Sequence, residues 1–192
     1  KDTEFTRVIG AKDGFFYTYG VVSKGLLSSI SSTDHVISYY DQKNFRRKFR
    51  KEIKAFEYKG KDADYVGSYM KDNGEAILYF EVYHSKLDKK FLISRSINNK
   101  GRLGSIEEIS SIQSKRKTDG DFKIRLSKDK SKVLIYSNGT YKRKEDEKFK
   151  VSVLDANHNP LWNKEIALPY RDGNFVLLNN AITNKGEVYI LG

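Results

Sequence analysis

The chain has 192 residues, enough for one domain with a sizeable core, and no cysteine, which excludes disulfides and thiolate chemistry. Its formal net charge of +11 attracts nucleic acid, acidic polysaccharide or anionic lipid non-specifically and says nothing about the fold. Hydrophobic residues make up only 38% and aromatic residues reach 13%, a balance that favours strands with one buried face over helices.

Turns rich in Asp, Gly and Lys recur along the chain, each between two apolar segments. They lie in AKDGFFYTY (11–19), MKDNGEAILYF (70–80), LSKDKSKVLIY (126–136) and ITNKGEVYIL (182–191). If Gly14, Gly74, Ser131 and Gly186 are equivalent, the turns recur at similar intervals throughout the chain. Such a regular period predicts an architecture built from repeats.

A third and a fourth strand follow each of the first three turns. The third strands HVISYYD, FLISRSI and FKVSVLD align three serines at nearly the same interval as the turns: Ser38, Ser94 and Ser152. Turn sequences rich in Asn and Asp come next, at 41–44, 97–101 and 155–160. The fourth strands end at three isoleucines that keep this interval again: Ile53, Ile109 and Ile166.

Four antiparallel strands repeated in this way are typical of a β-propeller blade. The sequence therefore predicts an all-β fold in a single domain, 1–192, with about three four-stranded blades and the first hairpin of a fourth. The approximate blades are 6–56, 64–111, 121–169 and 174–192. A β-sandwich is the alternative, but it does not explain the regular intervals. Because closed propellers usually have four to eight blades, we expect the remaining blades in a parent chain or a second chain.

The basic segment NFRRKFRKEIKAF, 44–56, fits two structures. Phe45, Phe49 and Ile53 recur at helical spacing among Lys and Arg, as in an amphipathic helix that binds membranes or nucleic acid. The same three residues share one face of a strand. The repeat predicts an outer strand with these residues turned inward and its charges protecting the edge from other sheets.

LSKDKSKVLIYSN, 126–138, resembles the WD40-like repeats of TolB-type β-propellers, whose hallmark is a small polar residue, Pro, Asp and Gly before a short apolar strand. Ser127 and Asp129 match this pattern, whereas Lys128 replaces the expected Pro and Lys130 the expected Gly. The other turns keep parts of it: Asp72 with Gly74, and Thr183 with Gly186. The resemblance implies a binding or scaffolding propeller, in bacteria often extracytoplasmic, and it brings no catalytic residues.

The resemblance favours a periplasmic or cell-surface location. No apolar run approaches the roughly 18 residues of a membrane-spanning helix, so no transmembrane segment is expected. A chain that begins at Lys1 without Met is expected to be a mature form or a piece of a longer protein.

Histidines and repeated carboxylates offer little catalytic chemistry. His35, His84 and His158 have no partners at metal-ligand spacing, so we expect solvent-facing strand or turn positions and no metal or other cofactor. Three glutamates repeat on the fourth strands, where we expect them to face solvent: Glu52, Glu108 and Glu165. Trp162 precedes Ile166 by four residues, and we expect it in the core of an outer strand.

Basic residues gather in three loops, 59–63, 114–121 and 141–148, that a propeller would place on one rim. The candidate ligand-binding residues are Lys59, Lys61, Lys115, Arg116, Lys117, Lys142, Arg143, Lys144 and Tyr141. They form an anion-binding face in this hypothesis, with Tyr58 and Tyr141 available for stacking. The alternative is that these loops are simply solvated.

The sequence thus favours a non-catalytic module for protein or ligand binding or scaffolding within a larger protein. Two alternatives stay open. One is a glycan-acting propeller enzyme that uses scattered carboxylates. The other is a binder of acidic polymer or nucleic acid that uses the basic rim. The expected partner is a protein or an acidic ligand.

Overall fold

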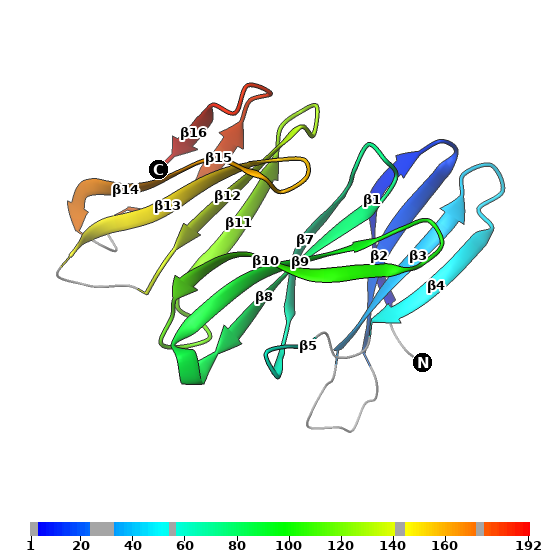
Figure 1. Ribbon diagram of the computed structural model, residues 1–192, viewed down its shortest axis with the longest axis horizontal. Helices are drawn as coiled ribbons and strands as arrows, with labels where there is room; N and C mark the ends of the chain where they lie inside the picture. The colour runs from blue at the N-terminus through cyan, green and yellow to red at the C-terminus, as the bar shows by residue number, and fades with distance from the viewer. Residues whose placement is uncertain (1–3, 24–32, 54–56, 141–144, 172–174) are drawn as a thin grey trace. The chain divides into compact units, whose positions relative to one another are not determined.

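The computed structural model describes residues 4–23, 33–53, 57–140, 145–171 and 175–192 (Figure 1). They confirm the prediction of an all-β fold with four-stranded antiparallel sheets. In this part of the chain, no helix is long and apolar enough to cross a membrane. The chain divides into two compact units, which we call unit 1 (1–80 and 94–107) and unit 2 (81–93 and 108–192).

Each four-stranded sheet pairs its strands in chain order, as the repeat predicts. The first sheet contains β1 (Glu4–Lys12), β2 (Phe15–Ser23), β3 (Thr33–Asp41) and β4 (Arg47–Ile53). The second contains β7 (Asp64–Met70), β8 (Ala76–His84), the 3-10 turn η1 (Ser85–Leu87), β9 (Lys89–Ile97) and β10 (Leu103–Gln113). The third contains β11 (Asp121–Leu126), β12 (Lys132–Asn138), β13 (Asp146–Asp155) and β14 (Pro160–Arg171). Two hairpins complete the described strands: β5 (Glu57–Tyr58) with β6 (Lys61–Asp62), and β15 (Asn179–Ile182) with β16 (Val188–Leu191).

The turn that joins a first strand to a second contains the same backbone hydrogen bond in three places. In each, an amide donates to the carbonyl three residues earlier: Gly74 to Lys71, Lys130 to Ser127 and Gly186 to Thr183, at 2.9–3.0 Å. These donors all have positive φ, +84°, +59° and +87° respectively. The position equivalent to Gly74 and Gly186 is therefore Lys130. The expected equivalence of Ser131 is wrong, and with Lys130 in its place the three positions are equally spaced in the sequence.

Side chains of the motif that resembles TolB-type repeats hold the turn together. The Ser127 hydroxyl donates to Asp129 Oδ1 at 2.6 Å and accepts from the Lys132 amide at 3.0 Å. The hydrogen bond from Ser127, followed by that from the Ser131 amide, lowers the pKa of the Asp129 carboxyl. At the equivalent turn, Thr183 Oγ1 likewise accepts from two backbone amides. These motif residues therefore have a structural role.

The turns between third and fourth strands repeat as regularly. Asp41, Asn98 and Asp155 each accept, through Oδ1, the amide two residues on, at 2.8–3.0 Å. These three residues are also equally spaced in the sequence. The chain leaves each turn through a residue with positive φ: Phe45, Gly101 and His158. His158 thus lies in a turn, as expected.

The segment at 44–56 contains a strand, β4, and its charged side chains at Arg47, Lys48 and Arg50 are exposed. Ile53 is buried, and Phe49 is half-buried and stacks on Tyr39 with a 5.6 Å centroid distance. Phe45 is 71% exposed, so its predicted inward position is wrong. The reason is that Phe45 lies in the turn with φ +54°, before the strand alternation begins at Arg47.

In unit 1 the first strands of two successive sheets, β1 and β7, are in contact. Gly10 lies so close to Met70 that a Cβ added to the glycine would be 2.7 Å from Met70 Cβ. His35 is buried, and its Nδ1 lies 2.8 Å from the Tyr19 hydroxyl. The expected solvent-facing position of His35 is wrong, because the aromatic ring of Phe80 covers it and Tyr19 supplies its polar partner.

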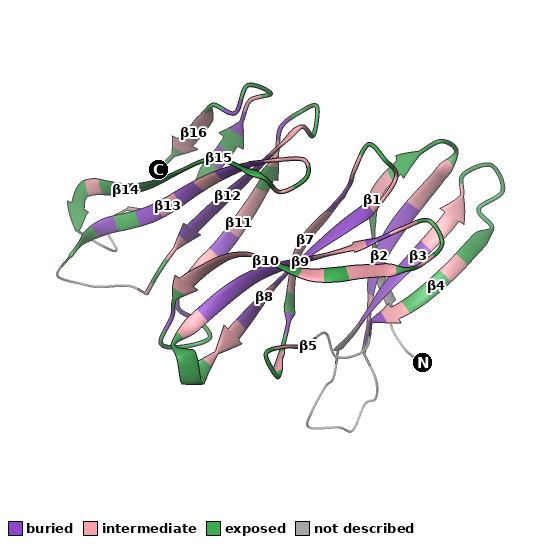
Figure 2. Ribbon diagram, in the orientation of Figure 1, coloured by how far each residue is buried: buried purple, intermediate pink, exposed green. Residues whose placement is uncertain are grey.

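Unit 2 has a core between the third sheet and the last hairpin. Its buried residues come from β12, β13 and β15: Leu134, Tyr136, Phe149, Val151, Val153 and Ile182. Figure 2 shows buried residues along β12 and β13 and exposed ones along most of β14. Trp162 lies on the last strand of its sheet, β14, as expected, but it is 38% exposed, so its predicted burial in the core is wrong. Its indole Nε1 instead donates to the Gly186 carbonyl at 3.2 Å.

Candidate functional site

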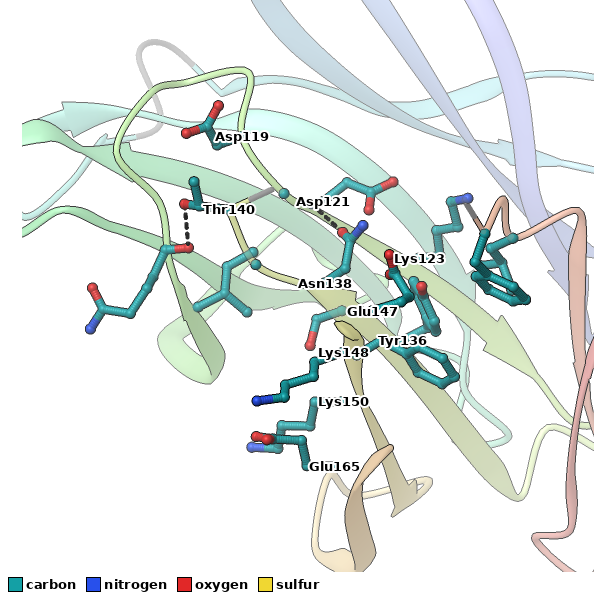
Figure 3. A pocket seen from close by; sticks show the side chains of 18 of the residues that line it. Asp119, Asp121, Lys123, Tyr136, Asn138, Thr140, Glu147, Lys148, Lys150 and Glu165 are labelled. Atoms are coloured by element: carbon teal, nitrogen blue, oxygen red, sulfur yellow. Dashed lines mark hydrogen bonds between the residues drawn. The ribbon is translucent and has the colours of Figure 1, made fainter. Parts of the chain in front are cut away.

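A pocket of about 660 Å³ lies within unit 2, beside one end of the third sheet (Figure 3). Its walls come from the end of β10, the β10–β11 loop, the start of β11, the end of β12, the β12–β13 loop, the start of β13, one residue of β14 and residues 175–177. For β11, β12 and β13 the meander explains this composition, because antiparallel strands bring the start of one strand and the end of the next to the same end of a sheet. The other walls come from β10 of the second sheet and from residues 175–177. Segments distant in sequence thus meet at one site.

Negative charge prevails in the described lining. Six carboxylates line the pocket, Asp119, Asp121, Glu145, Asp146, Glu147 and Glu165, against three ammonium groups, Lys123, Lys148 and Lys150. Lys150 and Glu165 are neighbours across β13 and β14. At neutral pH the lining therefore carries a formal excess of negative charge.

Asp119 and Glu147 are the buried carboxylates of this lining. The Arg116 Nε donates to Asp119 Oδ1 at 3.1 Å, whereas Asp119 Oδ2 is buried without a hydrogen-bond partner. The Ser114 hydroxyl is hydrogen-bonded to the Asp119 carbonyl at 2.9 Å and holds the backbone of this loop. Buried carboxylates act at short range more strongly than solvated ones, since little water screens them.

Aromatic rings form the apolar part of the lining. Tyr136 and Phe149 have ring centroids 5.0 Å apart, and Phe149 stacks on Phe175 at 6.1 Å. Burial, followed by the charges of Glu147 and Asp121, raises the pKa of Tyr136 well above its ordinary value, so this phenol is neutral at pH 7. Rings beside carboxylates are a combination that recognises cationic groups.

The predicted basic residues fall into separate groups. Lys115, Arg116 and Lys117 share the β10–β11 loop and are exposed, but they are not among the described residues that line the pocket. The Tyr83 hydroxyl donates to the Lys115 carbonyl at 2.6 Å and ties this loop to β8. Arg116 is paired with Asp119, which offsets part of the positive charge.

Lys59 and Lys61 lie on the β5–β6 hairpin of unit 1. Lys59 Nζ lies 4.9 Å from the centroid of the Tyr58 ring, so the face expected to stack on a ligand already contacts a cation. Four other predicted residues, Tyr141, Lys142, Arg143 and Lys144, lie outside the described residues. The convergence of the basic loops on one rim stays a prediction.

The repeated glutamates lie on the last strands of the sheets. Glu52 on β4 is half-buried, whereas Glu108 on β10 and Glu165 on β14 are exposed. Across the described ranges, no group of three or more His, Asp or Glu side chains is arranged to hold a metal ion.

Sequence reasoning missed the pocket carboxylates although the signal was present. SKRKTDGD and YKRKEDEK each place acidic residues directly after a basic run. The basic runs favour an anion-binding interpretation, in which the acidic residues that follow them, Glu145, Asp146 and Glu147, have no role. Which of these side chains the fold brings to the pocket depends on register, which composition does not reveal.

Comparison of the chain with family models, with curated proteins and with solved structures gave no match.

Proposed function

We propose that the chain is a β-propeller segment that acts as a non-catalytic binding module. The support is architectural: four-stranded sheets paired in chain order, turns repeated at a constant interval, and contact between the first strands of successive sheets within each unit, β1 with β7 and β11 with β15. The turn formed by Ser127 and Asp129, which resembles the TolB-type repeat, supports the same architecture.

The ligand of this module is a positively charged group, such as a Lys or Arg side chain that a protein partner inserts into the unit 2 pocket. The excess of carboxylates in the described lining carries this part of the proposal. A cation there meets the buried carboxylate of Glu147 and the ring of Tyr136, which is close enough for the Glu147 charge to raise its pKa. Complementary charge favours such a partner over an acidic one.

The test is a titration of the protein with a fluorescent peptide rich in Arg and Lys, followed by anisotropy. Asp121→Asn combined with Glu165→Gln removes two lining charges and is expected to weaken binding about tenfold, or about 1.4 kcal/mol. The matched control Glu57→Gln with Asp62→Asn removes two exposed carboxylates of unit 1 and should leave the affinity within about twofold. Equal weakening by both pairs, or equally tight binding of a Glu-rich peptide, contradicts the proposal.

A second candidate function is the binding of an acidic polymer by the β10–β11 loop. The observation that favours it is the run of three exposed basic residues, Lys115, Arg116 and Lys117. Heparin chromatography separates the binding of an acidic polymer from the binding of a cationic group. Polymer binding by this loop predicts that the double variant Lys115→Gln with Lys117→Gln elutes at lower salt. The control Lys86→Gln with Lys100→Gln should elute as the unchanged protein does. Retention no stronger than that of a charge-matched protein excludes polymer binding.

A further inference from the structure

The last hairpin, β15–β16, has a covered face and an uncovered face. Ile182 belongs to the unit 2 core, and Val188 and Ile190 pack against it. The opposite side chains, Tyr189 and Leu191, are 62% and 60% exposed. Their cross-strand partners are two further exposed residues, Ala181 and Asn179. We call the side formed by Tyr189, Leu191, Ala181 and Asn179 the outer face.

The repeat identifies the residues that occupy the same positions in the third sheet. At the β15–β16 turn the Thr183 amide donates to the Glu187 carbonyl, and at the β11–β12 turn the Ser127 amide donates to the Lys132 carbonyl. Glu187 and Lys132 are thus equivalent, and the β11–β12 turn has one extra residue, Ser131, between Lys130 and Lys132. Counting onward from them, Tyr189 corresponds to Leu134 and Leu191 to Tyr136.

These equivalent residues are buried, and the structure shows what covers them. Leu134 and Tyr136 are 0% and 2% exposed and form one cluster with side chains of the hairpin one repeat later: Ile182, Val188 and Ile190. In the second sheet the Lys71 amide donates to the Glu75 carbonyl, which makes Ile77 and Tyr79 the corresponding pair. They are 2% and 0% exposed.

Apolar exposure extends beyond the hairpin itself. Leu178 is 68% exposed, and its amide donates to the Leu191 carbonyl at 2.9 Å, which continues the strand pairing. Three large apolar side chains, Tyr189, Leu191 and Leu178, are thus exposed on or next to this hairpin, and exposed apolar residues that gather in one place favour an interaction surface.

We propose that the outer face binds a further antiparallel β-hairpin whose inward side chains follow the pattern of Ile182, Val188 and Ile190. The occupant is a sheet of the same repeat, because such a hairpin covers Leu134 and Tyr136 one repeat earlier. This inference rests on the propeller part of the proposed function and is independent of the ligand.

The absence of cysteine from the chain allows a direct test. The Tyr189→Cys variant carries a single thiol, whose maleimide labelling rate reports exposure of the outer face. Attaching a second copy of residues 175–192 through a flexible linker after Gly192 is expected to slow labelling at least tenfold. A control extension carries Ser at the three positions that correspond to Ile182, Val188 and Ile190. It should leave the maleimide labelling rate unchanged. A Lys164→Cys variant on β14 controls for general effects of the extension.

Equal labelling with both extensions overturns the inference. The inference is also overturned if the labelling rate of the unextended chain falls as the protein concentration rises, because the outer face then binds a second copy of the chain instead. Titration of the same extended proteins with the Arg-rich and Lys-rich peptide keeps the two claims separate. If the peptide binds as before and the thiol is not protected, only the docking face is rejected. If the thiol is protected and the peptide does not bind, only the proposed ligand is rejected.

Discussion

Lys130 has a backbone conformation that equivalent turns give to glycine. Its φ is +59°, in a region where a side chain carries a steric cost of about 1–2 kcal/mol. Lys130→Gly should therefore stabilise the protein by about 0.5–1 kcal/mol, after allowance for the greater freedom of glycine in the unfolded chain. Urea unfolding measures this. Lys128→Gly in the same turn lacks the positive φ and should not stabilise; a loss of stability in both variants contradicts the account.

The same residue shows where sequence interpretation stops. A left-handed residue is recognisable in sequence when it is Gly or Asn, and Lys130 is neither, so the spacing of the turns suggested Ser131. The resemblance to the TolB-type motif, which aligns Lys130 with its Gly, identifies the correct residue. Polar residues that accept backbone amides were easier to find. Asp129 and Asp155 both lie where turn composition put them, and their hydrogen bonds explain why those residue types occur there.

At the scale of elements, the contact between β1 and β7 depends on a residue without a side chain. Gly10→Val places atoms where Met70 lies, and overpacking of this kind costs about 1–3 kcal/mol. Gly67→Val on β7 is the matched control, since nothing lies within 4 Å of an added Cβ there. Urea unfolding of the two variants should show a loss of stability at Gly10 alone. Equal losses at both positions would mean that the close approach of the strands is unimportant.

Strand identity was predictable from the repeat, whereas side-chain direction was less so. The basic segment around Phe49 is a strand, although its periodicity also fits a helix. Its place after a repeated turn is what predicted the strand. Spacing alone predicted that Phe45 and Trp162 are buried, yet Phe45 lies in a turn and Trp162 is exposed on its edge strand. The pocket was not predictable for a related reason, since register determines which acidic residues line it.

For the whole molecule, the recurring feature is the constant sequence interval between the equivalent turn residues Gly74, Lys130 and Gly186. A propeller generates successive sheets by one rotation about a common axis, so equivalent points in consecutive sheets are equally far apart. These three repeats carry the period because they share their turn chemistry. The first repeat departs from it, since Lys12 pairs with Phe15 across a two-residue turn in which Asp13 and Gly14 both have positive φ, so the expected equivalence of Gly14 is wrong. The sequence carries no comparable signal for the angle between sheets, which depends on the volume of all the side chains packed between them.

Spin-label distances test the propeller claim most directly. Asp72→Cys, Lys128→Cys and Asn184→Cys introduce labels, two at a time, at equivalent exposed turn positions of three consecutive repeats, in a chain that has no other cysteine. The account predicts equal distances for the pairs 72/128 and 128/184, and a 72/184 distance about 1.4 to 1.8 times longer, the range for rings of four to eight blades. Clearly unequal distances for the two consecutive pairs would contradict a common rotation and with it the propeller.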